Sequence, residues 1–339
     1  MSDIKDSGET QAEVSQSRMR RNQLYLDPEP CLGNCSWIHD PSIYVQNGTY
    51  YRFSTSGNIA IVTAESLNGP WTYRGSLLEE RTRIKVDEAR QDIWAPNVFK
   101  IGDTFYCHYS VSYLGSQVSQ IGFATSKTLD PGTWTDHGSP DIPHSPKYNL
   151  IDPGVFQDTP GSPGYLTFGS YWSGIFSLQF PSSALVHRSD TLHSSPDIVT
   201  NQAHNKTTTA SIPLTYSTGS LRNLIRNTSV DPDVVEGAFM YKHAGQYYLF
   251  FSAGACCATP PLLAPPGREY RILVCRSARS DGRFVDVSHG DVYAPGGQGV
   301  LFDEQTQRTV LYYHYIKPSV GYAADRFFFG LNYLEWVGG

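Results

Sequence analysis

The chain has 339 residues, of which 40% are hydrophobic and 17% charged, and its formal net charge is −6. This acidic balance and the lack of a basic stripe argue against nucleic acid or an anionic membrane as a partner, because phosphate binding needs clustered Lys and Arg. No apolar run approaches the roughly 20 residues that a membrane-spanning helix requires. Tyr, Trp and Phe make up 13% of the chain, which favours strands and suits the stacking of sugar rings on aromatic faces.

The N-terminal segment, residues 1–28, is polar and lacks the apolar stretch of a secretory signal peptide. We expect it to be disordered or loosely attached, and we expect residues 29–339 to form a single catalytic domain that is monomeric. The adjacent Cys256 and Cys257 could form a vicinal disulfide, typical of an oxidising compartment, or remain two buried thiols. We expect an extracellular protein, with a cytoplasmic one as the alternative.

A repeat begins after this segment and runs to the C-terminus. Its units open at Asp40, Ala95, Asp152, Glu236 and Gly297. In each unit a short strand leads into a tight turn, and a second strand rich in Tyr and Phe returns with alternating apolar positions. Several units add a third strand, at residues 59–72, 121–135 and 272–284.

The spacing of the units predicts the fold. The first two intervals are 55 and 57 residues, and the longer third one contains a polar insertion at residues 181–232. Five units of three or four antiparallel strands, with no convincing helical periodicity, predict an all-β, five-bladed β-propeller. The first strand of each blade then surrounds a central channel.

Three of the five opening positions carry an acid, namely Asp40, Asp152 and Glu236. A single Asp-Pro pair is usually a turn signal, but this repeat places three carboxylates at one mouth of the channel. Buried like charges are costly unless they have partners or a task. Neighbouring carboxyl groups push their pKa values apart, which provides the acid and the base that glycoside hydrolysis needs.

With these residues in place, the chain resembles glycoside hydrolase family 43, and within it the fungal endo-α-1,5-L-arabinanases. The resemblance covers residues 30–337 and is specific because all its motifs occur in order at the repeat spacing. They are residues 39–43 (HDPSI), 92–96 (DIWAP), 149–153 (NLIDP), 235–237 (VEG), 255–257 (ACC), 294–299 (APGGQG) and 312–315 (YYHY).

The resemblance implies inverting, endo-acting hydrolysis of the α-1,5-linked arabinan of pectin. Asp40 would be the general base, Glu236 the general acid and Asp152 the residue that orients them and tunes their pKa. Inversion implies a base–acid separation of about 6.5–9.5 Å, which leaves room for water. The implied substrate contacts are His39, Trp94, Gly122, Asn149, Ile151, Ser170 and Trp172.

The resemblance also implies one calcium or similar ion in the channel, facing His314 and held largely through water, and no organic cofactor. From the residue alone, His314 is more simply a buried histidine on an aromatic strand. Trp94 likewise has a structural alternative, a core position between blades.

Two other functions remain open at this level. One is an exo-acting α-L-arabinofuranosidase or β-xylosidase of the same superfamily. Short connections around the first two blades favour an open groove and internal cleavage, but the insertion at residues 181–232 could wall off one side. The other is a carbohydrate-binding propeller without turnover, against which the three intact acids argue.

Overall fold

The structure is a computed structural model, which describes residues 27–169, 171–180, 221–226, 234–256, 270–282, 285–286, 295–316 and 326–336. Within these ranges the regular elements are strands, β1 to β19. No helix in them is long and apolar enough to cross a bilayer. Residues 1–26 of the predicted disordered segment and most of the predicted insertion at residues 181–232 lie outside the described residues.

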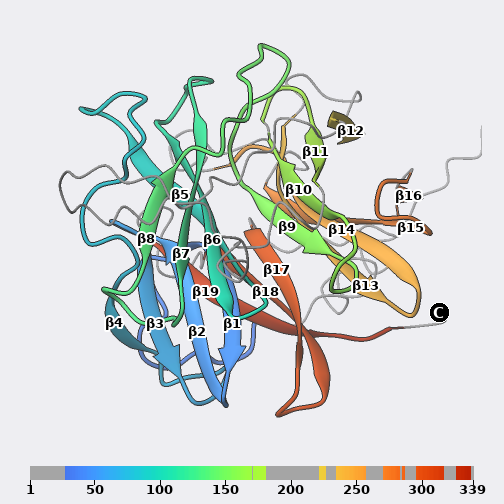
Figure 1. The fold of residues 1–339 in the computed structure, drawn as a ribbon. Coiled ribbons are helices and arrows are strands. Elements are labelled where there is room, and N and C mark those ends of the chain that lie inside the picture. The colour runs from blue at the N-terminus through green and yellow to red at the C-terminus, as the bar shows by residue number, and fades with distance from the viewer. Residues whose placement is uncertain are drawn as a thin grey trace, which may run out of the picture.

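The strands form five separate antiparallel sheets, which Figure 1 shows in chain order from blue to red around a common centre. Blade 1 contains β1 (His39–Gln46), β2 (Thr49–Thr55), β3 (Ala60–Ala64) and β4 (Thr72–Ser76). Blade 2 contains β5 (Asp92–Ile101), β6 (Thr104–Ser112), β7 (Gln120–Ser126) and β8 (Thr135–Gly138). Blade 3 contains β9 (Gly154–Gln157), β10 (Gly164–Phe168), β11 (Ile175–Phe180) and β12 (Leu221–Ile225). Blade 4 contains β13 (Val235–His243), β14 (Gln246–Ala253), β15 (Arg271–Ser277) and β16 (Val285–Asp286), and blade 5 contains β17 (Gly296–Asp303), β18 (Arg308–Ile316) and β19 (Phe327–Leu334). The predicted five-bladed propeller is confirmed.

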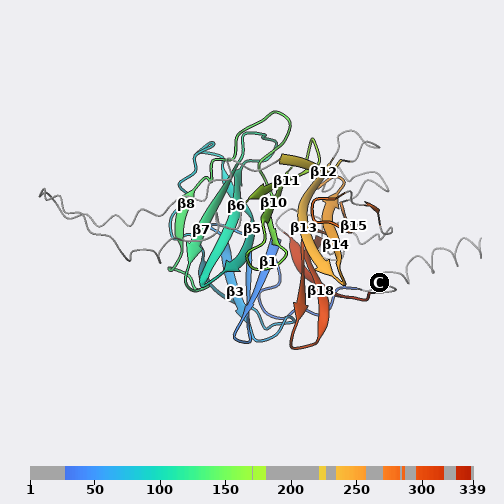
Figure 2. The same ribbon diagram turned by 45° about the vertical axis from the view of Figure 1, so that its right-hand side comes forward.

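The blades hold together through apolar side chains that fill the wedges between neighbouring sheets. One buried cluster joins Phe53 and Ile61 of blade 1 to Val98 and Phe105 of blade 2, and similar clusters lie further around the ring. Alternation along each strand produces these clusters, because every second side chain points to the same face of a sheet. The turned view of Figure 2 shows the same blades from another side.

Each blade contributes one residue with left-handed backbone at the start of its inner strand. These residues and their φ angles are Asp40 (47°), Ala95 (46°), Asp152 (52°), Gly237 (63°) and Gly297 (53°). In blades 1, 2, 4 and 5 this residue lies within a β-bulge, a device that re-aims side chains beside functional sites.

This register corrects one prediction from the repeat. The left-handed position of blade 4 is Gly237, so Glu236 stands one residue before the position that Asp40 and Asp152 occupy. Its structural equivalents are His39 in blade 1 and Trp94 in blade 2. Glycine adopts a left-handed conformation without steric cost, which explains why the bulge forms at Gly237.

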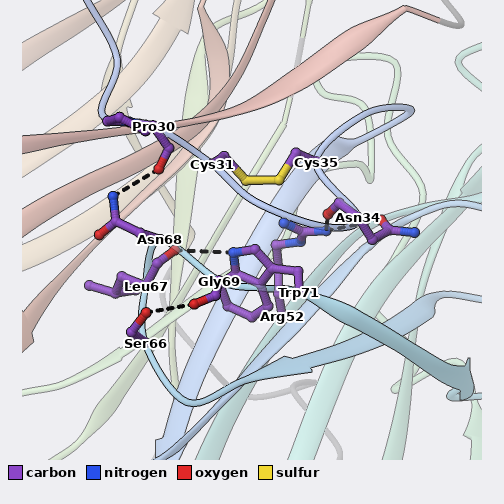
Figure 3. Close-up of a disulfide and its surroundings, with 10 residues drawn as sticks. All are labelled: Pro30, Cys31, Asn34, Cys35, Arg52, Ser66, Leu67, Asn68, Gly69 and Trp71. Atoms are coloured by element: carbon purple, nitrogen blue, oxygen red, sulfur yellow. Dashed lines mark hydrogen bonds between the residues drawn. A yellow bond between two sulfur atoms is a disulfide. The ribbon is translucent and has the colours of Figure 1, made fainter.

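Residues 29–38 close the ring by pairing with β19 at the outer edge of blade 5. Ile38 N–H donates to Phe327 O at 3.2 Å, and the chain then enters β1 of blade 1. Beneath this segment, the Cζ atom of Arg52 lies over the rings of Trp71 and Phe329, 4.7 and 4.6 Å from their centroids, and the two rings contact each other edge to face. Figure 3 shows Arg52 next to Trp71 and Asn34. Nη2 of Arg52 donates to Asn34 O at 2.6 Å, within the loop that the Cys31–Cys35 disulfide closes.

Candidate active site

The five left-handed residues meet at a cavity of about 40 Å³ where the inner strands converge. This volume holds more than one water molecule, since one needs about 10–15 Å³. The lining includes Asp40 and Asp152 together with Ala95, Gly237 and Gly297. The structure therefore brings chain segments that are more than a hundred residues apart to one small polar space.

Asp40 is held from two sides. Its Oδ2 accepts a hydrogen bond from Thr55 Oγ1 at 2.9 Å, and its backbone N–H donates to His314 Nδ1 at 2.9 Å. Burial raises the pKa of Asp40 above 3.8, while the neighbouring His39 and the Thr55 hydrogen bond act in the opposite direction. Asp40 thus has groups that favour its ionised form.

Asp152 is hydrogen-bonded to both neighbouring blades, blade 2 and blade 4. Its backbone N–H donates to Ser110 Oγ at 2.8 Å, and its Oδ2 accepts from Gly237 N–H at 3.1 Å. Burial raises the pKa of Asp152 well above 3.8, and the charges of Glu236 and Asp40 raise it further. The Gly237 hydrogen bond ties this carboxylate to the residue next to Glu236.

Glu236 is 8% exposed, and its Oε1 accepts a hydrogen bond from Tyr270 OH at 2.8 Å. Burial raises its pKa to about 7, the Tyr270 hydrogen bond lowers it, and the charge of Asp40 raises it again. A carboxyl group with this pKa carries a proton near neutral pH and is suited to general acid catalysis.

Together the three acids form an acid–base system with mutual electrostatic influence. Asp40 raises the pKa of both other acids, so the three carboxyl groups share one low-dielectric region. In such a set, one carboxylic acid can give a proton to a bound substrate while another, ionised carboxylate takes a proton from water.

The comparison with protein families agrees with this chemistry. The model of glycosyl hydrolases family 43 matches residues 35–337. The chain belongs to this family. The match includes all five blades and all three acids, so family membership makes the protein a glycoside hydrolase.

Relatives in this family include two Aspergillus proteins. A probable arabinan endo-1,5-α-L-arabinosidase A from Aspergillus flavus is 40% identical, and the alignment covers 93% of each chain. The arabinan endo-1,5-α-L-arabinosidase A of Aspergillus aculeatus is 38% identical with the same coverage.

Solved structures of the family share the fold. The α-L-arabinanase of Cellvibrio cellulosa matches with a TM-score of 0.67 and 23% identity, covering 89% of this chain and 93% of that one. An exo-1,5-α-L-arabinanase from a bovine ruminal metagenomic library matches with a TM-score of 0.68 and 21% identity, covering 91% and 97%.

Three predicted contacts of this family 43 protein occupy equivalent positions, one residue before the left-handed one. They are His39, Trp94 and Ile151, and the fourth blade has Glu236 there. Trp94 is partly exposed and belongs to none of the four hydrophobic clusters of the described chain. This position favours a surface at the channel mouth over a core position.

The other predicted contacts are more varied. Gly122 is buried in β7, and a Cβ there would lie 2.4 Å from the ring of Tyr109, so packing requires a glycine; its backbone contact with substrate stays a prediction. Asn149 is buried and donates to Ser116 O at 3.4 Å, which anchors the loop after β6. Trp172 is partly exposed and packs against Tyr171, whereas Ser170 lies outside the described residues.

Several functional residues were not predicted from the sequence. Thr55 and Ser110 lie near the ends of the second strands of blades 1 and 2, at equivalent register positions, and a hydroxyl group recurring there was a usable signal. Tyr270 and Gly297 gave no such signal. A Cβ on Gly297 would lie 2.3 Å from Asp40 Oδ1, so only glycine leaves room for the carboxylate.

The residues around His314 can be tested for their fit to an ion. His39, Asp40 and His314 offer ligand atoms within 4.8 Å of one another. However, Nδ1 of His314 accepts the Asp40 N–H, so the neutral ring carries its proton on Nε2 and cannot bind a metal directly. This buried Nε2 has no hydrogen-bond partner among the described residues, which fits a donor to channel water. The site therefore fits a hydrated cation that contacts His314 through water.

The described cysteines include disulfide-bonded ones and two buried thiols, Cys107 and Cys275. Cys31 and Cys35 form a disulfide, a pairing that the sequence had not indicated. Cys256 is also disulfide-bonded, but Cys257 lies outside the described residues, so the vicinal pair stays a prediction.

Proposed function

We propose that this family 43 protein hydrolyses α-1,5-linked L-arabinan at internal bonds with inversion of configuration. The observation that carries the proposal is the group of three electrostatically coupled acids: Asp40 and Asp152 line one cavity, and the buried Glu236, with its pKa raised to about 7, directly precedes the lining residue Gly237. The names of the Aspergillus relatives, at 38–40% identity over 93% of the chain, supply the substrate.

The roles of the acids follow from their surroundings. Glu236, which is protonated near neutral pH, gives its proton to the leaving glycosidic oxygen as the bond to the anomeric carbon breaks. Asp40, whose ionised form is favoured by Thr55 and His39, takes a proton from the attacking water. Asp152 neither gives nor takes a proton in this scheme. Its hydrogen bond from Gly237 N–H fixes the backbone next to Glu236 and so orients the acid.

Substrate recognition is proposed at the mouth of the channel. Trp94 would form the aromatic floor beside the cleaved bond, because it stands at the position that carries the acid in blade 4. Trp172 would contact the sugar at the rim, with Asn149 and Ile151 supporting the Asp152 region.

A hydrated calcium or similar ion beside Asp40 and His314 is a further part of this proposal. Asp40 supplies one hard oxygen ligand, and water supplies the others, as oxygen-preferring cations require. Such an ion would add positive charge next to the acids and favour their ionised forms. The Cys31–Cys35 disulfide supports an extracellular location, because disulfides persist in oxidising compartments.

The test is a time course of products from linear α-1,5-arabinan. Internal cleavage releases mixed oligosaccharides early, whereas the alternative exo-acting enzyme releases one small product throughout. Glu236→Gln and Asp40→Asn should lose nearly all activity, by a factor of about 10²–10⁴ each. Full activity of Glu236→Gln would remove the acid assignment, and the absence of any soluble product from the native protein would remove the enzyme proposal.

A further inference from the structure

The third strand of blade 4 brings one tyrosine to the channel mouth. Tyr270 directly precedes β15, whose first residue Arg271 pairs with Ala253 at the end of β14. Ala253 in turn pairs with Val235, the residue before Glu236. The sheet register therefore delivers the Tyr270 side chain to the same end of the blade as Glu236.

The phenol of Tyr270 is fixed rather than adaptable. The side chain is 5% exposed, its OH donates to Glu236 Oε1 at 2.8 Å, and its ring stacks on His314 with an interplanar angle of 8°. A Cβ on Gly296 would lie 1.9 Å from the ring, so the phenol fills the space that a side chain occupies at the equivalent positions of blades 1 to 4. The stack on His314 and the close contact with Gly296 thus hold the hydroxyl against one carboxyl oxygen.

We propose that Tyr270 is a positioning residue for the catalytic acid, which holds Oε1 of Glu236 so that the transferable proton resides on Oε2. This inference rests on the proposed role of Glu236. An oxygen that already accepts the Tyr270 hydrogen bond is the less basic of the two, so the carboxyl proton occupies the other oxygen. A fixed Oε1 also fixes the direction in which the Oε2–H bond points.

The acids themselves keep Tyr270 in its donor form. Burial and the charges of Glu236, Asp152 and Asp40 all raise the pKa of the phenol well above its ordinary value. A hydrogen bond with Ser252, which pairs with Glu236 across the sheet, acts in the opposite direction and lowers this pKa, but burial is the largest cause. The Tyr270 hydroxyl therefore stays protonated throughout the pH range in which Glu236 carries its proton.

The test is Tyr270→Phe assayed on two substrates of different leaving-group ability. On linear arabinan the leaving oxygen needs a proton, and we expect kcat to fall about 10- to 100-fold with little change in KM, part of the full effect of a general acid. On a 2,4-dinitrophenyl arabinotrioside the leaving group needs no proton, and we expect a loss no greater than about threefold. An equal loss on both substrates would overturn the positioning role.

A matched control is Tyr50→Phe. Tyr50 OH also hydrogen-bonds a buried carboxylate, that of Asp303, but at the ends of β2 and β17 remote from Asp40. We expect the ratio of kcat on arabinan to kcat on the dinitrophenyl substrate to stay at its native value in Tyr50→Phe. A ratio that shifts as much as in Tyr270→Phe would mean that any lost tyrosine–carboxylate bond has this effect, and the inference would fall.

A second variant covers the case in which Tyr270→Phe does not fold. Gly296→Ala displaces the ring while keeping its hydroxyl, and it should show the same selective loss on arabinan. Glu236→Gln separates the two proposals. If it remains fully active, the assigned acid is wrong; if it is inactive while Tyr270→Phe keeps the native ratio, the positioning role alone is wrong.

Discussion

The backbone N–H of Asp40 in blade 1 donates a hydrogen bond to Nδ1 of His314 in blade 5 at 2.9 Å. His314 occupies the same register position in its blade as Thr55 and Ser110 occupy in blades 1 and 2. Each is paired with the residue that precedes the left-handed one, namely Gly296, His39 and Trp94. Thr55 and Ser110 accept the N–H groups of Ala95 and Asp152 at 2.8 Å in the same way. His314 is therefore the member of this series that closes the ring, and it does so on the backbone of the proposed base.

Replacement of His314 should separate its role in ring closure, through Nδ1, from its role in activity, through Nε2–H. In His314→Asn the side-chain oxygen can take the place of Nδ1, so we expect native-like stability and a loss of activity because Nε2–H is gone. In His314→Ala both are lost, and the free energy of unfolding should fall by about 1–3 kcal/mol from the unsatisfied Asp40 N–H. Urea unfolding and initial rates on arabinan measure the two effects; equal stability of both variants would contradict the closure role.

Much of the fold could be predicted because its signals are local. The Asn47-Gly48 turn between alternating aromatic strands predicts a hairpin from adjacent residues alone, and the structure has β1 and β2 there. The predicted alignment of blade 4 was wrong by one residue. The sequence aligns the acid Glu236 with the acid Asp40, whereas the backbone places the left-handed residue of blade 4 at Gly237. Tyr270 was missed because its contact with Glu236 depends on a third strand and on packing against Gly296, which no local pattern reports.

Glu236→Gln should stabilise the protein in a pH-dependent manner. The pKa of Glu236 is raised from 4.5 to about 7, so the stability associated with its protonated form is complete below pH 4.5 and is lost as the pH rises through 7. Glutamine stays neutral and can still accept the Tyr270 hydrogen bond. We expect equal stability of the two proteins near pH 4 and an advantage of the variant at pH 8, on the order of 3 kcal/mol at most. Thermal unfolding at both pH values checks this, and a variant less stable at pH 8 would contradict it.

The pH profile of kcat/KM should report the Thr55 hydrogen bond. Thr55 donates to Asp40 Oδ2 and lowers the pKa of that carboxyl group, so its removal raises this pKa. In Thr55→Val we therefore expect the acidic limb of the profile to move to higher pH, while the basic limb set by Glu236 stays in place. Thr55→Ser keeps the hydroxyl and serves as the control. A shift of both limbs together would indicate a general distortion instead.

The Arg52 contact should contribute to stability without taking part in catalysis. Arg52 is fully buried, and burial lowers its pKa to about 9. Arg52→Ala would remove the packing of the guanidinium against Trp71 and Phe329, at a cost of about 3–5 kcal/mol in unfolding free energy. Cys31→Ser with Cys35→Ser opens a loop with a sequence separation of 4 and should cost about 2 kcal/mol. In both cases kcat at 20 °C should remain native; a selective loss of kcat in a fully folded variant would contradict this separation.

Gly297→Ala should inactivate the protein through the Asp40 carboxylate. Alanine itself tolerates this backbone, because Ala95 has a φ of 46° at the equivalent position of blade 2. The added Cβ would lie 2.3 Å from Asp40 Oδ1, 2.7 Å from Asp40 Cα and 2.8 Å from His314 Nδ1, so Asp40 and its carboxylate must move. Since a small displacement of a catalytic group can cost about 100-fold in rate, we expect kcat on arabinan to fall by this order with only about 1–2 kcal/mol of lost stability. Gly102→Ala, at an exposed left-handed turn with nothing within 4 Å, is the control for backbone strain and should keep native kcat. A Gly297→Ala protein with native kcat would show that Asp40 does not need its observed position.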